Sequence, residues 1–330
     1  MKSEGTLLLT RREVADLLGI QECIAAVELA FELYGQGKTS PPGILGVHAA
    51  DGGFHIKAGL MDLKRRYFVA KANANFPGNG KFGLPTIQGV IIVCDGQNGQ
   101  LLAVMDSIEI TILRTGAATA VAAKYLSRED SSVLTICGCG NQGRISLKML
   151  SQIRPITKVF AYDVDRTRAE QFSEEFSGEL QIEVAPVTEL SGAFRQSDII
   201  VTCTPSKRFF LKSEDISPGT FIAAVGSDNE EKQELEPALC KDSKLVVDIL
   251  EQCATIGELH HALENGVTDR NDVHAELGEI VAGHKTGRAA ESEIIVFDST
   301  GMALQDTIAA SIVYERAIEA KIGTKINFLA

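Results

Sequence analysis

One stretch decides the fold of this chain: SVLTICGCGNQGRISLKML, residues 132–150. Its residues 133–136 form a continuous run of strand-forming side chains, which predicts a buried β-strand. Gly138, Gly140 and Gly143 then give a G-x-G-x-x-G pattern, and a helical pattern follows. In this pattern the glycines permit a tight turn, close approach of the backbone to a pyrophosphate, and close packing of helix on strand. Free N–H groups at the helix N-terminus favour phosphates.

An acidic residue at the expected distance strengthens this interpretation. The next apolar strand ends just before Asp163, which follows Gly143 by 20 residues (163 − 143). At this offset an acidic side chain binds the ribose 2′-hydroxyl of NAD and repels the 2′-phosphate of NADP. Arg166 and Arg168 follow closely enough to soften that discrimination. We therefore expect a preference for NAD, with NADP possible, rather than a glycine-rich turn without a ligand.

The composition is that of an ordinary globular protein. A chain of 330 residues, of which 45% are hydrophobic and 23% charged, suits two domains. The net charge of −12, without a Lys/Arg block, disfavours nucleic acid and anionic membranes as partners. No apolar run reaches the roughly 20 residues of a membrane span. The N-terminus lacks the apolar stretch of a signal peptide.

The cysteines indicate a reducing compartment. There are seven, an odd number, scattered from Cys23 to Cys253, which is typical of thiols in a cytoplasmic protein. Cys137 and Cys139 flank Gly138, but no second pair stands nearby. They are therefore interpreted as small side chains in a crowded turn rather than as metal ligands.

The remaining patterns predict two kinds of structure. The first part contains mainly antiparallel strands at residues 6–9, 53–58, 67–73, 84–93 and 101–105. Its helices are expected at 11–18, from about residue 22 onward, and in an alanine-rich stretch that ends at about residue 127. Thr10 is the expected N-cap of the first helix. The second part alternates as βαβ units require, with further strands at 159–162, 182–185, 198–203, 221–225, 245–248 and 294–297, and helices at 166–176, 188–195 and 304–320.

Several segments together resemble the ornithine cyclodeaminase/μ-crystallin family over nearly the whole chain, closest to its archaeal-type alanine dehydrogenase and ketimine reductase members. They are KANANFP (71–77), GLPT (83–86), ILRTGAATAVAAKYL (112–126), ICGCGNQG (136–143), VTCTPS (201–206), AAVGSDNEEKQEL (223–235) and VFDSTGMALQD (296–306). The resemblance implies an α/β fold: a Rossmann NAD(P)-binding domain over residues 118–320, and an α+β substrate and dimerisation domain from 1–117 plus the tail 321–330. It also implies a homodimer.

The resemblance assigns the substrate carboxylate to Arg114 and Lys71. A guanidinium fork suits a bidentate carboxylate, and we expect Arg114 at a strand-to-helix junction. Lys71, on an otherwise buried strand, needs a partner or a ligand, and the family role is to share the carboxylate or the imine nitrogen. The alternatives are a surface arginine and a structural ion pair.

Asp228 matches the catalytic acid/base of the family, and Thr300 matches a position that faces the substrate. Asp228 follows the predicted strand at 221–225, at the carboxyl edge where α/β sheets bind ligands. There it could hold the substrate ammonium and exchange its proton; the alternative is a capping aspartate. The resemblance further assigns dinucleotide contacts to Thr86, Arg114, Gly138, Gly140, Asn141, Gln142, Gly143, Asp163, Thr204, Val225, Gly226, Ser227, Lys232 and Ser299.

Two departures from the family pattern bear on the substrate. The cyclodeaminases carry an arginine where this chain has Gly43, and an acidic residue where Lys57 stands. A lysine there would repel the distal ammonium of ornithine at close range. We therefore expect a substrate whose side chain is neutral or anionic, with Lys57 among the groups that bind it.

A group of acids and histidines in the C-terminal third is a candidate metal site. Its members are Glu258, His260, His261, His274, Glu276 and Glu279. Their spacing matches no zinc signature, and the family uses no metal, so hydrogen-bonded helix residues are the expected interpretation.

Together these observations predict an NAD(P)-dependent oxidoreductase that interconverts an L-amino acid and its imino acid, of alanine dehydrogenase, ketimine reductase or iminosuccinate reductase type. Two alternatives stay open at this point. One is an ornithine cyclodeaminase, which recycles bound NAD within a turnover and forms proline and ammonia. The other is a non-catalytic, crystallin-like protein that binds NADP and a small ligand.

Overall fold

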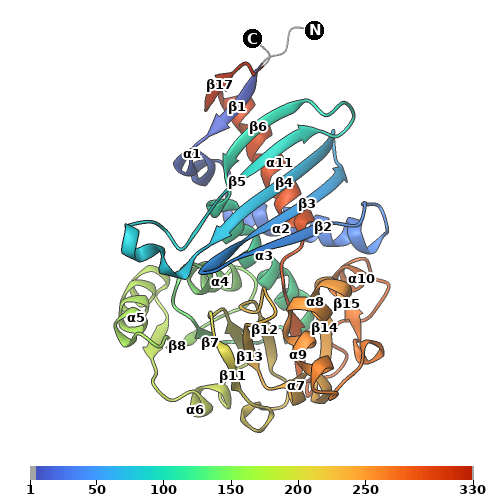
Figure 1. Ribbon diagram of the computed structural model, residues 1–330. Helices are drawn as coiled ribbons and strands as arrows, with labels where there is room; N and C mark the ends of the chain where they lie inside the picture. Colours follow the sequence, from blue (N-terminus) through green and yellow to red (C-terminus); the bar gives the residue numbers. More distant parts are fainter. Residues whose placement is uncertain (1–4, 329–330) are drawn as a thin grey trace. The chain divides into compact units, whose positions relative to one another are not determined.

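The computed structural model describes residues 5–328 and divides into two compact units (Figure 1). The first contains the chain up to Arg114 together with the part from Met302 onward, and we call it the mixed-sheet unit. The second, Thr115–Gly301, is the parallel-sheet unit. None of the helices in the described residues is long and apolar enough to cross a membrane.

The mixed-sheet unit is built on a seven-stranded sheet in the order β17-β1-β6-β5-β4-β3-β2. The strands are β1 (Thr6–Leu9), β2 (Gly43–Ala49), β3 (Gly52–Asp62), β4 (Arg66–Asn75), β5 (Ile87–Asp95), β6 (Leu101–Asp106) and β17 (Thr324–Ile326). Neighbouring strands are antiparallel except β1 and β6, which are parallel. Because β17 pairs with β1, residues 324–326 belong to the sheet of this unit.

The mixed-sheet unit also contains helices. They are α1 (Arg11–Leu17), α2 (Ile20–Gly35), the start of α3 (Ile108–Leu126) and α11 (Ala303–Ala320), with the 3₁₀ helix η1 (Pro77–Phe82) between β4 and β5. Thr10 caps α1 in a reciprocal capping box with Glu13. Helix α11 packs on β3, β4 and α2. Gly59 of β3 permits this approach, because a Cβ there would lie 2.6 Å from Thr307 Oγ1.

The placement of α11 differs from the predicted domain boundary, which put residues 304–320 in the Rossmann domain. The helix belongs to the mixed-sheet unit because its first three turns are buried on nearly every side, and the sheet of that unit supplies the apolar surface they contact. A strand-helix alternation in sequence predicts the helix but not which sheet it covers.

The parallel-sheet unit contains an eight-stranded, wholly parallel sheet in the order β15-β14-β16-β12-β10-β7-β8-β9. Its strands are β7 (Val133–Cys137), β8 (Lys158–Tyr162), β9 (Glu183–Pro186), β10 (Ile199–Thr202), β12 (Phe221–Ala224), β14 (Lys244–Val247), β15 (Ala275–Glu276) and β16 (Ile295–Asp298). The strand order reverses between β7 and β10, as in Rossmann folds, where ligands bind outside the carboxyl ends of the strands. The predicted α/β class with a Rossmann-type domain is confirmed.

Short helices and one small sheet complete this unit. The helices are α4 (Asn141–Leu150), α5 (Arg166–Leu180), α6 (Ser191–Phe194), α7 (Pro237–Asp242), α8 (Leu250–Ile256), α9 (Glu258–Glu264) and α10 (Leu277–Val281), with 3₁₀ turns η2 (Ser213–Asp215) and η3 (Arg270–Asp272). Strands β11 (Lys207–Leu211) and β13 (Gln233–Leu235) pair separately. The helix expected at 188–195 is the much shorter α6.

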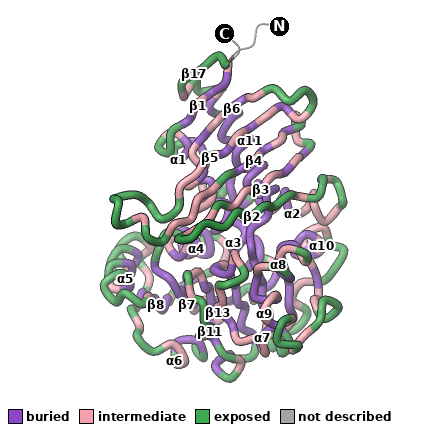
Figure 2. The backbone as a smooth tube through the Cα atoms, in the orientation of Figure 1, coloured by how far each residue is buried: buried purple, intermediate pink, exposed green. Residues whose placement is uncertain are grey.

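The two sheets differ in how far their strands are buried. In the parallel sheet, β10, β12 and β16 are buried along their whole lengths, which explains their continuous apolar sequences. In the mixed sheet, β2 is exposed at every residue (Figure 2). It is an edge strand, and it still carries the apolar side chains of Ile44, Leu45 and Val47.

Candidate functional site

Two lysines face each other on neighbouring strands of the mixed sheet. Lys71 of β4 pairs in register with Lys57 of β3, and both are buried, with 3% and 8% of their surface exposed. Burying an ammonium group is unfavourable unless an opposite charge or hydrogen bonds compensate for the lost water. The structure therefore has to supply a partner for Lys71.

That partner is Asp306 of α11. The Nζ of Lys71 lies 2.8 Å from Oδ1 and 2.7 Å from Oδ2 of the carboxylate, and 3.3 Å from Thr111 Oγ1. The Nε of Arg114 forms a second ion pair with Asp306 Oδ1 at 3.2 Å. One fully buried carboxylate is thus shared by two buried cations, an arrangement that sequence reasoning did not foresee.

Arg114 lies in the second turn of α3 rather than at a strand-to-helix junction. The helix begins earlier than expected because Asp106 Oδ1 accepts a hydrogen bond from the N–H of Ile108 at 2.9 Å. Arg114 also donates through NH1 to Gln305 Oε1 at 3.0 Å. With its oxygen engaged in this way, Gln305 leaves its buried Nε2 donor without a hydrogen-bond partner among the described residues.

The environment of this cluster shifts the pKa values of both Lys71 and Asp306. Burial lowers the pKa of Lys71 to about 7, with Arg114 and Lys57 acting in the same direction and Asp306 opposing them. Burial would raise the pKa of Asp306, but Lys71 and Arg114 outweigh it and hold that pKa below its usual range. Two cations, one carboxylate and an unsatisfied amide donor form a site that fits a ligand with acceptor oxygens only, such as a second carboxylate.

The glycine-rich loop of the parallel-sheet unit has the geometry that the sequence predicted. Gly138 has a φ of +103°, and a Cβ there would lie 2.9 Å from the carbonyl oxygen of Cys203. A Cβ on Gly143 would lie 2.1 Å from the carbonyl oxygen of Gly138. Gly140 is the N-cap of α4 and makes no side-chain capping bond. These residues fit an anionic group bound at the helix N-terminus.

Asp163 lies beside this loop, directly after β8. Its Oδ2 accepts from the N–H of Cys139 at 3.0 Å, and its Oδ1 accepts from the N–H of Asp165 at 3.0 Å. The carboxylate is therefore held in place next to the glycine turn. The two arginines that were expected to soften its selectivity are ion-paired locally, Arg166 with Glu170 at 2.8 Å and Arg168 with Asp165 at 3.5 Å.

The buried Glu234 forms hydrogen bonds to the residues that follow β10 and β12, where further predicted cofactor contacts lie. Glu234 accepts from the N–H of Thr204 at 2.6 Å and from that of Gly226 at 3.0 Å. Burial raises its pKa, although these hydrogen bonds favour the carboxylate. A Cβ on Gly226 would lie 2.4 Å from Glu234 Oε2, so a side chain there would have to displace the carboxylate. Sequence reasoning missed Glu234, whose only signal is an acid within the short QEL strand β13.

Asp228 and Lys232 form an ion pair in the turn that follows β12. Lys232 Nζ donates to Asp228 Oδ1 at 2.6 Å, and Ser227 Oγ donates to the carbonyl oxygen of Lys232 at 2.6 Å. The side chain of Asp228 remains 47% exposed, whereas that of Lys232 is 16% exposed. The turn thus presents a carboxylate to solvent at the carboxyl edge of the sheet, and Val225 at its start bonds back to Thr202 of β10.

The other predicted residues are fixed by the backbone or by buried acids. Thr300 donates to Asp248 at 3.0 Å and accepts from Gln252 at 2.6 Å, and the N–H of Ser299 donates to the carbonyl oxygen of Ala224. Asn141 is the first residue of α4. In the mixed-sheet unit, Thr86 lies between η1 and β5, where its carbonyl oxygen accepts from Phe76.

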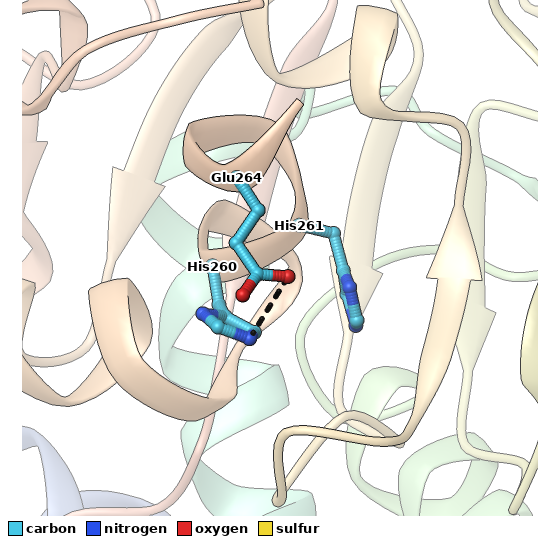
Figure 3. A group of neighbouring side chains, drawn as sticks. All are labelled: His260, His261 and Glu264. Atoms are coloured by element: carbon cyan, nitrogen blue, oxygen red, sulfur yellow. Dashed lines mark ion pairs between the residues drawn. The ribbon is translucent and has the colours of Figure 1, made fainter. Parts of the chain in front are cut away.

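The acids and histidines weighed as a metal site do not gather as one group. Glu258 accepts from the N–H groups of Glu234 and Leu235, His274 bonds to the carbonyl oxygen of Thr286, Glu276 accepts from Leu250, and Glu279 pairs with Lys285. His260 and His261 instead lie near Glu264, which the sequence-based set did not include (Figure 3).

A doubly wound sheet, a glycine loop and a fixed acid after the second strand define a Rossmann-type dinucleotide-binding protein, and a second unit adds a buried cation cluster. The family model described as ornithine cyclodeaminase/mu-crystallin family matches residues 4–321, so the chain belongs to that family. It is 41% identical to an alanine dehydrogenase of Archaeoglobus fulgidus over 98% of both chains.

Solved structures give the same result. An archaeal alanine dehydrogenase dimer with bound NAD has a TM-score of 0.94 and 40% identity, over 98% of this chain and 99% of that one. The Thermococcus litoralis Δ1-pyrroline-2-carboxylate reductase in complex with NADH and L-proline has a TM-score of 0.92 and 35% identity, over 97% of this chain and all of that one. Family membership, predicted from the motifs, is confirmed.

The Asp306 pairing predicts an uneven response to two aspartate substitutions. Asp306→Asn should lower the free energy of unfolding by about 3 kcal/mol or more, because it leaves two buried cations without a carboxylate. Asp62→Asn, at an exposed aspartate ion-paired with Arg66, should change it by about 0.5 kcal/mol or less. Urea unfolding measures both.

Added acetate provides the complementary measurement. It should raise the melting temperature of the Asp306→Asn variant more than that of the wild type, because a carboxylate ligand replaces the lost charge. Equal unfolding free energies for the two aspartate variants, or equal acetate effects, would contradict the assigned pairing.

Proposed function

We propose that this chain is an NAD-dependent oxidoreductase that interconverts an L-amino acid and its imino acid. The observation that carries the proposal is the buried Lys71–Asp306–Arg114 cluster, whose two cations and free amide donor fit a substrate carboxylate. It occurs in a chain that also has a dinucleotide-binding glycine loop. The similar alanine dehydrogenase and the similar reductase with NADH and L-proline support this choice of reaction.

In the proposed mechanism, Arg114 and Lys71 bind and orient the substrate carboxylate, and Asp306 positions both cations without touching the substrate. The glycine loop and the N-terminus of α4 would hold the pyrophosphate of NAD, and Asp163 would bind the adenosine ribose. Bound NAD or NADH supplies the hydride chemistry. Asp228, oriented by its ion pair with Lys232, exchanges the proton of the substrate nitrogen as this atom changes between imine and amine.

The remaining predicted contacts fit the same scheme. Thr204, Val225, Gly226, Ser227 and Ser299 line the strand ends that would receive the dinucleotide, and Thr300 would contact the substrate. Thr86 stays a proposed cofactor contact. The seven cysteines are free thiols, five of them buried, which supports the cytoplasm as the location.

Lys57 bears on the choice of substrate. It is buried opposite Lys71 and lowers the pKa of Lys71 through its own charge, so the two ammonium groups are close enough to interact. A third ammonium on the substrate side chain would be repelled at this range. The candidates are therefore pyruvate with ammonia, cyclic ketimines such as pyrroline-2-carboxylate, and acidic imino acids such as iminosuccinate, rather than ornithine.

A panel of these imino acids, followed by NADH absorbance, tests the reaction. We expect steady NADH consumption with at least one of them. Asp228→Asn should lower turnover by about 100-fold, because the amide cannot exchange a proton. Glu230→Gln, at an exposed acid of the same turn, is the matched control and should leave turnover unchanged. Proline and ammonia formed from ornithine with catalytic NAD and no NADH build-up would overturn the proposal in favour of a cyclodeaminase.

The low pKa of Lys71 predicts how carboxylate affinity depends on pH. A bound carboxylate favours the ammonium and raises the pKa of Lys71 above its value of about 7 in the free protein. Affinity is therefore complete below about pH 7 and falls as pH rises, by at most about tenfold per pH unit. Inhibition constants of a simple carboxylate between about pH 6 and 9 measure this. Lys71→Met should bind weakly without that decline, and a flat wild-type profile would be inconsistent with the role of Lys71.

Asp163 predicts the choice of cofactor. Asp163→Ser should raise the ratio of NADP to NAD use, because it removes a carboxylate that repels the 2′-phosphate. Asp165→Asn, which keeps an N-capping oxygen on α5, should leave the ratio unchanged. Fluorescence titration with both reduced nucleotides measures the ratio. Wild-type affinity for NADP that is about tenfold above that for NAD would refute the role of Asp163.

We further propose that the chain forms a homodimer through the exposed apolar face at β2. Ile44, Leu45 and Val47 are 42%, 57% and 48% exposed on this edge strand, and Phe54 of the neighbouring β3 is 45% exposed. An edge strand with exposed apolar side chains is a template for pairing with another chain. The similarity to an alanine dehydrogenase dimer supports a second copy as the occupant.

Light scattering tests this assembly. The wild type should give about twice the mass of one chain, since the isologous pairing of a cyclic dimer buries the same face of both copies. Val47→Glu combined with Leu45→Glu should shift the mass toward one chain. Leu29→Glu, at an exposed leucine of α2, is the control and should not. A monomeric mass for the wild type at micromolar concentration would contradict the proposed dimer.

A further inference from the structure

Three side chains of helix α9 gather on the parallel-sheet unit. His260, His261 and Glu264 each place one possible ligand atom within 4.8 Å of the others. His260 Nε2 lies 3.5 Å from Glu264 Oε2, and in Figure 3 the carboxylate of Glu264 points toward the space between the two rings. The helix spacing explains this pair, since residues four apart lie on the same face. No part of the proposed reaction uses these residues.

The hydrogen bond of His261 fixes which of its nitrogens has a lone pair. Its Nε2 lies 2.7 Å from the carbonyl oxygen of Lys232. A carbonyl oxygen can only accept, so Nε2 carries the proton and, in the neutral ring, Nδ1 has the free lone pair. Histidines that bind metals commonly donate their other N–H to a carbonyl or carboxylate in this way, which orients the ring. His261 is thus already in a tautomer that can bind a metal.

The donor set and its exposure indicate the class of ion. Two imidazoles and one carboxylate suit zinc and its neighbours, whereas calcium and magnesium require more oxygen ligands. The side chain of His260 is 18% exposed and that of Glu264 is 64% exposed, so an ion and its waters have access from solvent. Zinc ligands at bond lengths of about 2.1 Å stand about 3.4 Å apart in a tetrahedron. A change of rotamer of the exposed Glu264 side chain can bring its carboxylate to this distance from the two rings.

We propose that His260, His261 and Glu264 form a binding site for a divalent transition-metal ion of the zinc type, with water completing its coordination. The ion polarises the N–H of His261 and strengthens its bond to the carbonyl oxygen of Lys232. Because Lys232 is ion-paired with Asp228 at 2.6 Å, occupancy stabilises the turn that carries Asp228. The site stands apart from the reaction proposed above, so its existence does not depend on that function.

Equilibrium dialysis of Zn²⁺ against the full chain tests the site. We expect one ion per chain, and we expect His260→Ala, His261→Ala and Glu264→Gln each to weaken binding by about tenfold or more. His284→Ala removes an exposed histidine elsewhere on the same unit and should leave binding unchanged. Absence of zinc binding to the wild type overturns the proposal, as does equal zinc binding by the wild type and the three ligand variants.

Two further readouts separate metal binding from a folding defect. Without zinc, Glu264→Gln should melt with the wild type, because its side chain is mostly exposed. With zinc, the melting temperature of the wild type and of His284→Ala should rise, and that of Glu264→Gln should not. Zinc should also slow amide exchange in residues 229–233 of the wild type and of His284→Ala, but not of Glu264→Gln. Identical exchange with and without zinc would contradict the link through Lys232.

Discussion

The mixed-sheet unit depends on one interaction, the sharing of the Asp306 carboxylate by Lys71 and Arg114. Either cation alone in an apolar interior would be unfavourable by several kcal/mol. The carboxylate comes from α11, near the C-terminal end of the chain, and Lys71 precedes it by 235 residues. This constraint gives a reason for the C-terminal segment to return to the first unit, where β17 also pairs with β1. The cluster is thus a structural brace that remains rich in positive charge and hydrogen-bond donors, and both properties suit a carboxylate substrate.

Buried carboxylates brace the parallel-sheet unit as well, but there they accept backbone N–H groups instead of pairing with cations. Glu258 accepts from Glu234 and Leu235, and Glu234 in turn accepts from Thr204 and Gly226. Burial raises the pKa of both glutamates, and it raises that of the neighbouring Asp298 to about 7. The backbone hydrogen bonds that these carboxylates accept hold the loops at the carboxyl ends of the strands in place. Those loops contain many of the residues proposed to bind the dinucleotide.

The sequence predicted the parts whose signal is local. The glycine spacing, the strand and the offset of Asp163 specified the Rossmann-type fold, and the motifs specified the family, because each needs only neighbouring residues. It did not predict the roles of Asp306 or Glu234. A single acid in an apolar segment indicates that its side chain is buried, but not which distant group it pairs with. The sequence also misplaced Arg114 relative to the start of α3, because the cap that starts the helix is the side chain of Asp106, eight residues before Arg114 (114 − 106). The domain assignment of α11 failed for a similar reason: its apolar faces require a sheet, and its sequence does not say which.

In the proposed reaction, a substrate held by its carboxylate exchanges a hydride with a nicotinamide. The most direct measurement is isotope transfer from NADH with both C4 hydrogens of the nicotinamide replaced by deuterium, with the amino acid product analysed by mass spectrometry. We expect one deuterium at Cα of the product, and loss of that transfer in Arg114→Ala through poorer positioning. An unlabelled amino acid product, or label that remains entirely in the nucleotide while product forms, would contradict the proposed reaction.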